Sequence, residues 1–142
     1  MRLQSLLMLS LLSACGQQEP EQARHCDPLG QWDVTMQMAS FCPGDQYVSR
    51  TFMIRPGTIH DPEGYTWAEP VVYGWGADCI LSFRQEKAFP DGSSVVYQGQ
   101  YTMSGEDRSV TGFGRATKHS EKGVLCTEAF GAVGVVTEEL QP

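Results

Sequence analysis

Residues 31–38 read Gln31-Trp-Asp-Val-Thr-Met-Gln-Met38, and polar and apolar side chains alternate through this stretch without a break. Successive side chains of a β-strand point to opposite faces, so the even-numbered apolar residues share one face and the odd-numbered polar residues share the other. We therefore predict a strand that is buried on one side and exposed on the other.

The rest of the chain repeats this pattern in short runs separated by turn residues. No run after residue 14 has helical periodicity, and Pro-Gly, Glu-Gly and Asp-Gly pairs separate the runs. The predicted strands are 31–38, 47–55 (Phe52 and Ile54 on one face), 66–75 (Trp67, Val71, Tyr73 and Trp75 on one face), 79–83, 95–103, 109–117 and 124–137. Pro70 cannot donate a hydrogen bond, so it predicts an edge, a bulge or a break within 66–75.

Seven or eight short strands with regular turns indicate an all-β fold. We expect a small antiparallel up-and-down β-barrel, with a β-sandwich as the alternative. Gly112, Gly114, Gly131 and Gly134 lie inside strand-like runs. Glycines at such positions often mark bulges or sharp coiling in a small closed barrel.

Gly30-Gln31-Trp32, at the start of the first predicted strand, resembles the Gly-x-Trp motif of lipocalins and related up-and-down barrels. The resemblance implies a lipocalin-like barrel in which Trp32 packs across the closed end. An eight-stranded barrel is just wide enough for side chains or one small ligand. The aromatic residues that would fill this interior or face a ligand are Trp32, Trp67, Tyr73, Trp75, Phe83, Tyr97 and Tyr101.

The N-terminus carries a second resemblance. Arg2, an apolar run from Leu3 to Leu12 and the sequence Leu12-Ser13-Ala14-Cys15 are similar to a bacterial lipoprotein signal. The resemblance implies cleavage before Cys15 and acyl chains on this cysteine, which would anchor the protein stably. An uncleaved anchor helix and an ordinary secretory signal are the alternatives, although a membrane-spanning helix needs roughly 20 apolar residues.

The lipoprotein resemblance divides the chain into a signal peptide (1–14), a lipidated cysteine with a polar tether (15–25) and a barrel domain (26–142). The tether has almost no apolar side chains and is expected to hold the domain off the bilayer. Gly16, which follows the cysteine, resembles the outer-membrane default of Gram-negative bacteria. We therefore expect a lipid-anchored protein of the cell envelope, in the outer membrane if the bacterium is Gram-negative.

Four cysteines remain beside Cys15, and an even number in a small exported domain predicts two disulfides. Three pairings are open, and no pair has zinc-ligand spacing. If eight strands run up and down, Cys26 and Cys79 lie where two strands start at one end of the barrel. Cys42 and Cys126 then lie at the other end. Strand parity therefore favours the pairs Cys26–Cys79 and Cys42–Cys126.

Charge and motifs narrow the function classes. The net charge of −7 argues against a nucleic-acid partner and against electrostatic docking on anionic lipid. His25 lies in the tether, and His60 and His119 lie in predicted polar turns, where a histidine is usually solvated; the turn 60–63 would at most hold a metal loosely. Motifs of serine hydrolases, zinc proteases and phosphate-binding loops are missing. We expect no enzyme, and no bound metal or cofactor.

The leading hypothesis is a lipid-anchored envelope module that binds a partner through its surface. The first alternative is a lipocalin-like carrier of a small apolar ligand. The second is a small-barrel inhibitor of a hydrolase, by analogy of shape. A continuous interior cavity would favour the carrier, and a filled interior would favour the surface module or the inhibitor.

Overall fold

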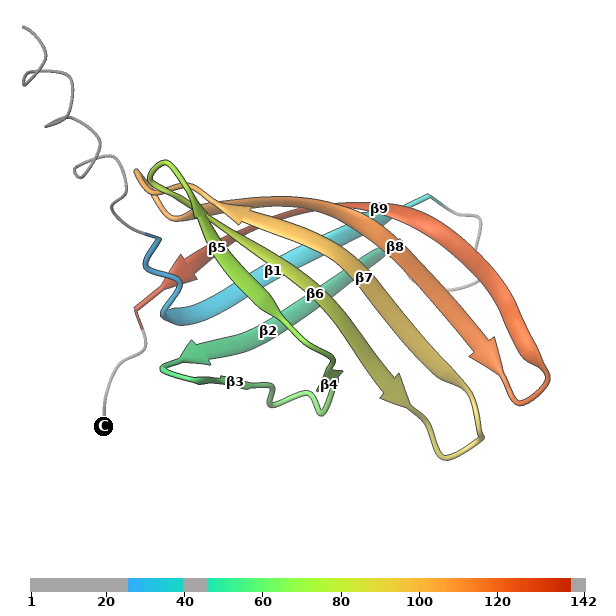
Figure 1. Cartoon of the computed structure of the whole chain (residues 1–142). Helices are drawn as coiled ribbons and strands as arrows, with labels where there is room; N and C mark the ends of the chain where they lie inside the picture. Colours follow the sequence, from blue (N-terminus) through green and yellow to red (C-terminus); the bar gives the residue numbers. More distant parts are fainter. Residues whose placement is uncertain (1–25, 40–45, 139–142) are drawn as a thin grey trace, which may run out of the picture.

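The computed structural model describes residues 26–39 and 46–138, which form one antiparallel sheet coiled into a nearly closed barrel (Figure 1). The strands are β1 (Gly30–Met38), β2 (Tyr47–Arg55), β3 (Thr58–His60), β4 (Thr66–Trp67), β5 (Val71–Trp75), β6 (Asp78–Ala88), β7 (Ser94–Met103), β8 (Ser109–Ser120) and β9 (Gly123–Thr137). The all-β class and the small antiparallel barrel are confirmed. Among the described residues, no helix has the length and apolar character needed to cross a membrane.

Consecutive strands pair from β1 to β3 and from β5 to β9, and β1 pairs with β9, whereas β3 and β4 lie at opposite edges of the sheet. The order is β3-β2-β1-β9-β8-β7-β6-β4, and β5 also pairs with β6. β1 and β9 pair from Gln31 opposite Thr137 to Met38 opposite Phe130. Within the described part of the chain, the unpaired edges are therefore those of β3 and of β4 with β5. We call the gap between these edges the open seam.

Alternate residues of each long strand point into the barrel. In β1, Trp32 is 0% and Val34 is 2% exposed. Aromatic rings meet in the centre, with 4.6 Å between the ring centroids of Phe52 and Trp67 and 4.3 Å between those of Phe83 and Tyr101. Large rings therefore fill the part of the barrel in which β1 begins.

Inward glycines make room for these rings. A Cβ atom on Gly112 would lie 2.5 Å from Cδ1 of Tyr101, and one on Gly114 would lie 2.6 Å from Cζ of Phe130. A Cβ atom on Gly134 would lie 2.1 Å from the Asp33 carbonyl oxygen, so each of these three glycines allows a close approach that a side chain would block. Gly131 faces open space instead, and the bulge between β8 and β9 lies at Lys118 and His119.

The predicted strand 66–75 is broken in two. The amide of Ala68 still donates to the Arg84 carbonyl at 2.9 Å, but Glu69 has a φ of 45° and Pro70 follows it. The break reverses the side-chain alternation, because Trp67 and Val72 both pack against the core although one residue number is odd and the other is even. The prediction of an edge or a break at Pro70 is confirmed.

The same reversal overturns the prediction that Tyr73 and Trp75 face the barrel interior. Tyr73 is 44% and Trp75 is 74% exposed, so both lie on the outer face of β5 and not inside the barrel. The single face predicted for residues 67–75 is wrong because the alternation was assumed to run through Pro70. His60 is a second correction, since it lies in the edge strand β3 and not in a turn.

The end at which β1 begins, the Trp32 end, is held by several links. Trp32 Nε1 donates to the Pro28 carbonyl at 2.8 Å, and Arg108 Nη2 donates to the Leu29 carbonyl at 2.6 Å. Cys26 and Cys79 form a disulfide with their Cα atoms 4.7 Å apart, which confirms this predicted pair. These links join the segment before β1 to β6 and to the chain between β7 and β8.

The other predicted disulfide stays a prediction. Cys126 lies in β9 opposite Lys118, near the end of the barrel away from Trp32, and it is disulfide-bonded. Cys42 lies outside the described residues, as do Cys15 and the lipoprotein signal.

Candidate ligand pocket

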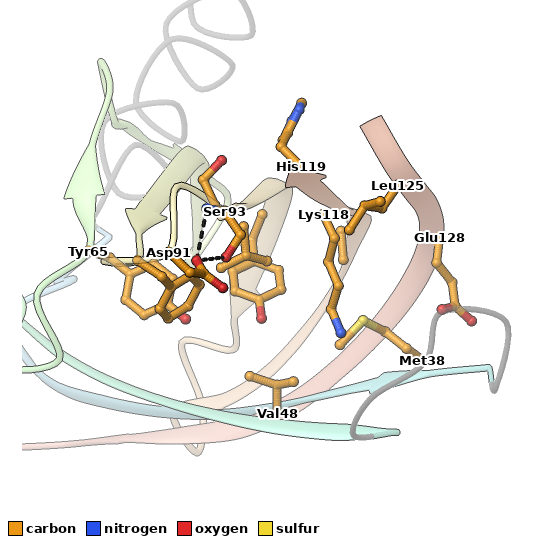
Figure 2. Close-up of a pocket in the computed structure, with 14 residues that line it drawn as sticks. Met38, Val48, Tyr65, Asp91, Ser93, Lys118, His119, Leu125 and Glu128 are labelled. Carbon is orange, nitrogen blue, oxygen red and sulfur yellow. Dashed lines mark hydrogen bonds between the residues drawn. The ribbon is translucent and has the colours of Figure 1, made fainter. Parts of the chain in front are cut away.

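A pocket of about 490 Å³ lies at the end of the barrel opposite Trp32. We call this end the pocket end; there β1 ends, β2 begins, and the β6–β7 and β8–β9 hairpins turn (Figure 1). The lining residues are Met38, Val48, Tyr65, Phe89, Asp91, Ser93, Ser94, Val95, Tyr97, Ala116, Lys118, His119, Leu125 and Glu128. Figure 2 shows these side chains around one hollow.

Some inward positions of the strands carry short side chains near this end, beside larger ones such as Met38 and Tyr97. Ala116 is the inward residue of β8 and Val95 that of β7, and each is nearly buried against the pocket. At the Trp32 end, the corresponding space is taken by the indole of Trp32 and the ring of Phe52. A barrel of this size holds either side chains or one small ligand, so residue size decides which part is hollow.

The β6–β7 hairpin forms part of the rim. Asp91 Oδ1 accepts hydrogen bonds from the Ser93 hydroxyl at 2.5 Å and from the Ser93 amide at 2.9 Å, drawn as dashed lines in Figure 2. These two bonds lower the pKa of the Asp91 carboxyl below its ordinary value. The hairpin therefore keeps a compact turn with an ionised carboxylate at neutral pH.

Two tyrosines form the floor of the pocket. The ring centroids of Tyr65 and Tyr97 are 5.8 Å apart. Burial raises the pKa of both phenols, more than the nearby Arg50 guanidinium lowers it. Both phenols are therefore uncharged at neutral pH.

A buried arginine supports this floor. Arg50 is 1% exposed, and its guanidinium carbon lies 3.6 Å from the centroid of the Tyr65 ring. Its Nη1 donates to Glu63 Oε2 at 2.6 Å, and its Nη2 donates to Asp61 Oδ2. Its Nε donates to Gln85 Oε1 at 3.0 Å.

We call Arg50, Asp61, Glu63, Tyr65 and Gln85 the Arg50 cluster. It joins β2 to β6 and to the β3–β4 connection, so it links the two edges of the open seam. Two further contacts hold the connection in place. Trp67 Nε1 donates to Asp61 Oδ2 at 2.9 Å, and Lys87 Nζ donates to the Glu63 carbonyl at 2.8 Å.

Charged groups of both signs stand around the pocket. Lys118 and His119 come from the end of β8, and Glu128 comes from β9. Figure 2 shows the Lys118 side chain reaching toward Met38. The described residues contain no group of three or more His, Cys, Asp or Glu side chains arranged to hold a metal ion. The pocket thus combines mainly apolar walls, a tyrosine floor and a mixed-charge rim, which suits a ligand with an apolar body.

The structure separates the aromatic residues that the sequence grouped together. Tyr97 lines the pocket. Trp32, Phe83 and Tyr101 belong to the buried core beneath it, and Trp67 packs against that core. Tyr73 and Trp75 are outside, as described above. Of the histidines, His119 lines the pocket, His60 is exposed on β3, and His25 lies outside the described residues.

Sequence reasoning missed the Arg50 cluster. A signal was present, because Arg50 lies two residues before Phe52 and four before Ile54, on the face predicted to be buried. An arginine at an inward position needs buried acceptors. Asp61 and Glu63, taken as part of a solvated turn, supply them.

Comparison of the chain with protein-family models, with curated proteins and with solved structures finds no match.

Proposed function

We propose that this protein binds and carries a small molecule with an apolar body in the pocket at the end of its barrel. The observation that supports the proposal is the pocket of about 490 Å³ with a mostly apolar lining. Its volume falls within the roughly 300–1,000 Å³ that ligand pockets usually have.

The contrast with the rest of the interior supports the same proposal. Rings of Trp32, Phe52 and Tyr101 pack against one another below the pocket, so a ligand has no through passage along the barrel axis there. A carrier site of this kind takes one ligand through one opening. Its few polar groups would orient the ligand, and its walls would shield the apolar part from water.

Native mass spectrometry tests this proposal. The full chain with Cys15→Ser, exported without an acyl anchor, should carry extra mass that is lost on denaturation. Val48→Trp places a large ring in the pocket and should abolish that mass, whereas Val71→Trp on the exposed face of β5 should retain it. A bare protein that also fails to bind added fatty ketones, acids and amines would contradict the carrier function.

The surface-binding hypothesis is the second candidate, and β5 supports it. Val71, Tyr73 and Trp75 are 54%, 44% and 74% exposed on this edge strand. A groove of about 500 Å³ lies beside them in the open seam, lined in part by Ile59, Pro70 and Val72. Exposed strand edges with apolar side chains are common places for partner strands. The hydrolase-inhibitor hypothesis has no comparable feature among the described residues.

Trp75→Ala separates the two candidates. If the surface of β5 is the functional site, the change should remove crosslinking to an envelope protein and leave the ligand mass in place. Phe113→Ala, on the exposed face of β8, is the matched control. Equal crosslinking of the unchanged protein, Trp75→Ala and Phe113→Ala would contradict surface binding through β5.

We further propose that Cys15 carries the acyl chains that hold the protein on the cell-envelope membrane. The support is the sequence 12–15 and the preceding apolar run. Cys15→Ser should move the protein from the detergent-dependent membrane fraction to the soluble envelope fraction. Continued membrane association would contradict the anchor.

A further inference from the structure

Two buried hydrogen-bonding groups lie beneath the pocket without a partner among the described residues. They are Gln85 Nε2 on β6 and Tyr101 Oη on β7. Both residues are 0% exposed. Buried polar atoms of proteins are nearly always hydrogen-bonded, so this pair calls for a complementary group.

The Arg50 guanidinium defines which end of the Gln85 amide is a donor. Arg50 Nε and Nη2 donate to Gln85 Oε1 at 3.0 and 2.8 Å. Turning the amide round would bring its NH2 group against two other donors. Gln85 Nε2 is therefore the amide donor that is left over.

Tyr101 also offers a hydrogen. Burial raises the pKa of its phenol, so the hydroxyl stays protonated well above neutral pH. The Gln85 amide is near enough to lower that pKa somewhat, but no hydrogen bond of acceptable geometry joins the two side chains. Gln85 and Tyr101 are fully buried residues of the paired strands β6 and β7, and an oxygen with free lone pairs can accept a hydrogen bond from each of these donors.

The register of β6 and β7 relates this pair to the pocket. Gln85 lies directly opposite Tyr97, which forms part of the pocket floor. Tyr101 is two inward positions beyond Tyr97 on the same strand. Along the barrel axis, the pocket floor formed by Tyr65 and Tyr97 therefore lies nearer the rim, and Tyr101 lies further inside.

Local charge restricts the group further. The Arg50 cluster contains one guanidinium and two carboxylates, those of Asp61 and Glu63. A negatively charged ligand group placed beside these two carboxylates would lose its hydration. Arg50 is already paired with both carboxylates, so it would not compensate a further negative charge. An uncharged acceptor such as a carbonyl oxygen meets the requirement without this cost.

We propose that Gln85 Nε2 and Tyr101 Oη receive the oxygen of an uncharged carbonyl at the end of an apolar ligand, such as an alkyl ketone. The inference rests on the proposed carrier function. It adds the direction of binding, since the oxygen enters first and the alkyl chain remains among the apolar walls of the pocket.

Calorimetric titration of the full-length Cys15→Ser protein tests the proposal with four probes of one chain length. They are methyl heptyl ketone, the alkene in which CH2 replaces the ketone oxygen, nonanoate and nonylamine. The ketone should bind most tightly. Tyr101→Phe should weaken ketone binding about three- to tenfold, the usual contribution of one hydrogen bond. Binding of the alkene should be unchanged.

Gln85→Glu is the second variant, because it keeps an acceptor for Arg50 and removes the Nε2 donor. This variant should also weaken binding of the ketone more than binding of the alkene. Tyr73→Phe and Gln98→Glu make the same changes at exposed positions of β5 and β7 and should alter neither affinity. The melting temperature of unliganded Tyr101→Phe should stay the same or rise, because its hydroxyl has no protein partner.

The outcomes separate this inference from the carrier function. If ketone and alkene bind equally and Tyr101→Phe changes neither, the carbonyl site is overturned while the carrier function stands. A lower melting temperature of Tyr101→Phe with unchanged ketone affinity assigns the hydroxyl a structural role and also overturns it. Tighter binding of nonanoate or nonylamine overturns the uncharged acceptor. If none of the four probes binds, the result contradicts the carrier function, on which the carbonyl site rests.

Discussion

The two ends of this barrel share the same strands and the same inward alternation, but only one end is filled. At the Trp32 end, Trp32 and Phe52 stack with their ring centroids 5.8 Å apart. At the pocket end, the inward side chains include Ala116 and Val95, and about 490 Å³ stays open. The comparison shows that alternation makes a barrel, whereas the sizes of the inward residues decide where it can hold a ligand.

The Arg50 cluster marks the boundary between the two ends. Above it lie the phenols of the pocket floor, and below it lie the stacked rings of the core. A buried cation with two carboxylates is a costly way to fill space. Its position favours a role in holding the open seam and the pocket floor in one geometry.

The largest expected effect on stability comes from removing a core side chain at the Trp32 end. Trp32→Ala removes a 0% exposed indole and its hydrogen bond to Pro28, and should lower the free energy of unfolding by about 3–5 kcal/mol. Phe89→Ala at the pocket end should cost at most about 1 kcal/mol, since Phe89 is 40% exposed. Urea denaturation measures both. Equal losses would contradict the contrast between the ends.

A substitution in the Arg50 cluster should lower the free energy of unfolding by nearly as much. Arg50→Met leaves the 4% exposed Asp61 carboxylate without its cation and should cost about 3–5 kcal/mol. The control is Arg84→Met, whose pair with Glu86 is 3.4 Å long with both side chains more than 40% exposed. That change should cost no more than about 1 kcal/mol. A small loss for Arg50→Met would show that the cluster is dispensable for the fold.

Alkaline pH should act through the buried phenols near the boundary. Burial raises the pKa of Tyr97 and Tyr101 above the ordinary value of 10.0. Below pH 10 the phenols are protonated in both the folded and unfolded states, so their contribution is constant. Above it the unfolded chain loses protons that the folded barrel retains, and stability falls as the pH rises.

Phenylalanine at positions 97 and 101 should therefore reduce the alkaline loss of stability, as followed by circular dichroism. Tyr47→Phe, which removes an exposed phenol, controls for the loss of one tyrosine. An unchanged alkaline slope in the double variant would contradict the buried, protonated state of these phenols.

The smallest effect compares one turn motif at both ends. Asp91 and Asp107 each accept bonds from the hydroxyl and amide of the serine two residues later. Those bonds lower the pKa of both carboxyls below 3.8, so each turn stabilises the fold above that pH and loses this contribution as the pH falls.

Asp91→Asn and Asp107→Asn should therefore cause similar small losses of stability at pH 7. Only Asp91→Asn should alter ligand affinity, because Asp91 lies on the pocket rim. Carboxyl titration by NMR checks the lowered pKa values. An equal effect of both changes on ligand affinity would place the ligand outside the pocket.

The long strands could be predicted from local alternation, and one disulfide could be predicted from the parity of an up-and-down strand order. Strand β2 runs from Tyr47 to Arg55 as predicted, and strand parity correctly paired Cys26 with Cys79. The break at Pro70 was predicted, but the reversal of the side-chain alternation across Glu69, which has a positive φ, was not. Tyr73 and Trp75 consequently lie outside, since period-two reasoning cannot recover a lost register.

By itself, the sequence determined that this chain forms short antiparallel strands, and it favoured a barrel over a β-sandwich and the pair Cys26–Cys79 over the other pairings. The strands follow from alternation within each strand, and the cysteine pair follows from the direction of successive strands along the chain. Only the tertiary structure decided that Arg50 is neutralised inside, that Ala116 leaves a hollow, and that Gln85 and Tyr101 lie beneath it. Those features depend on which side chains from distant strands face each other across the interior.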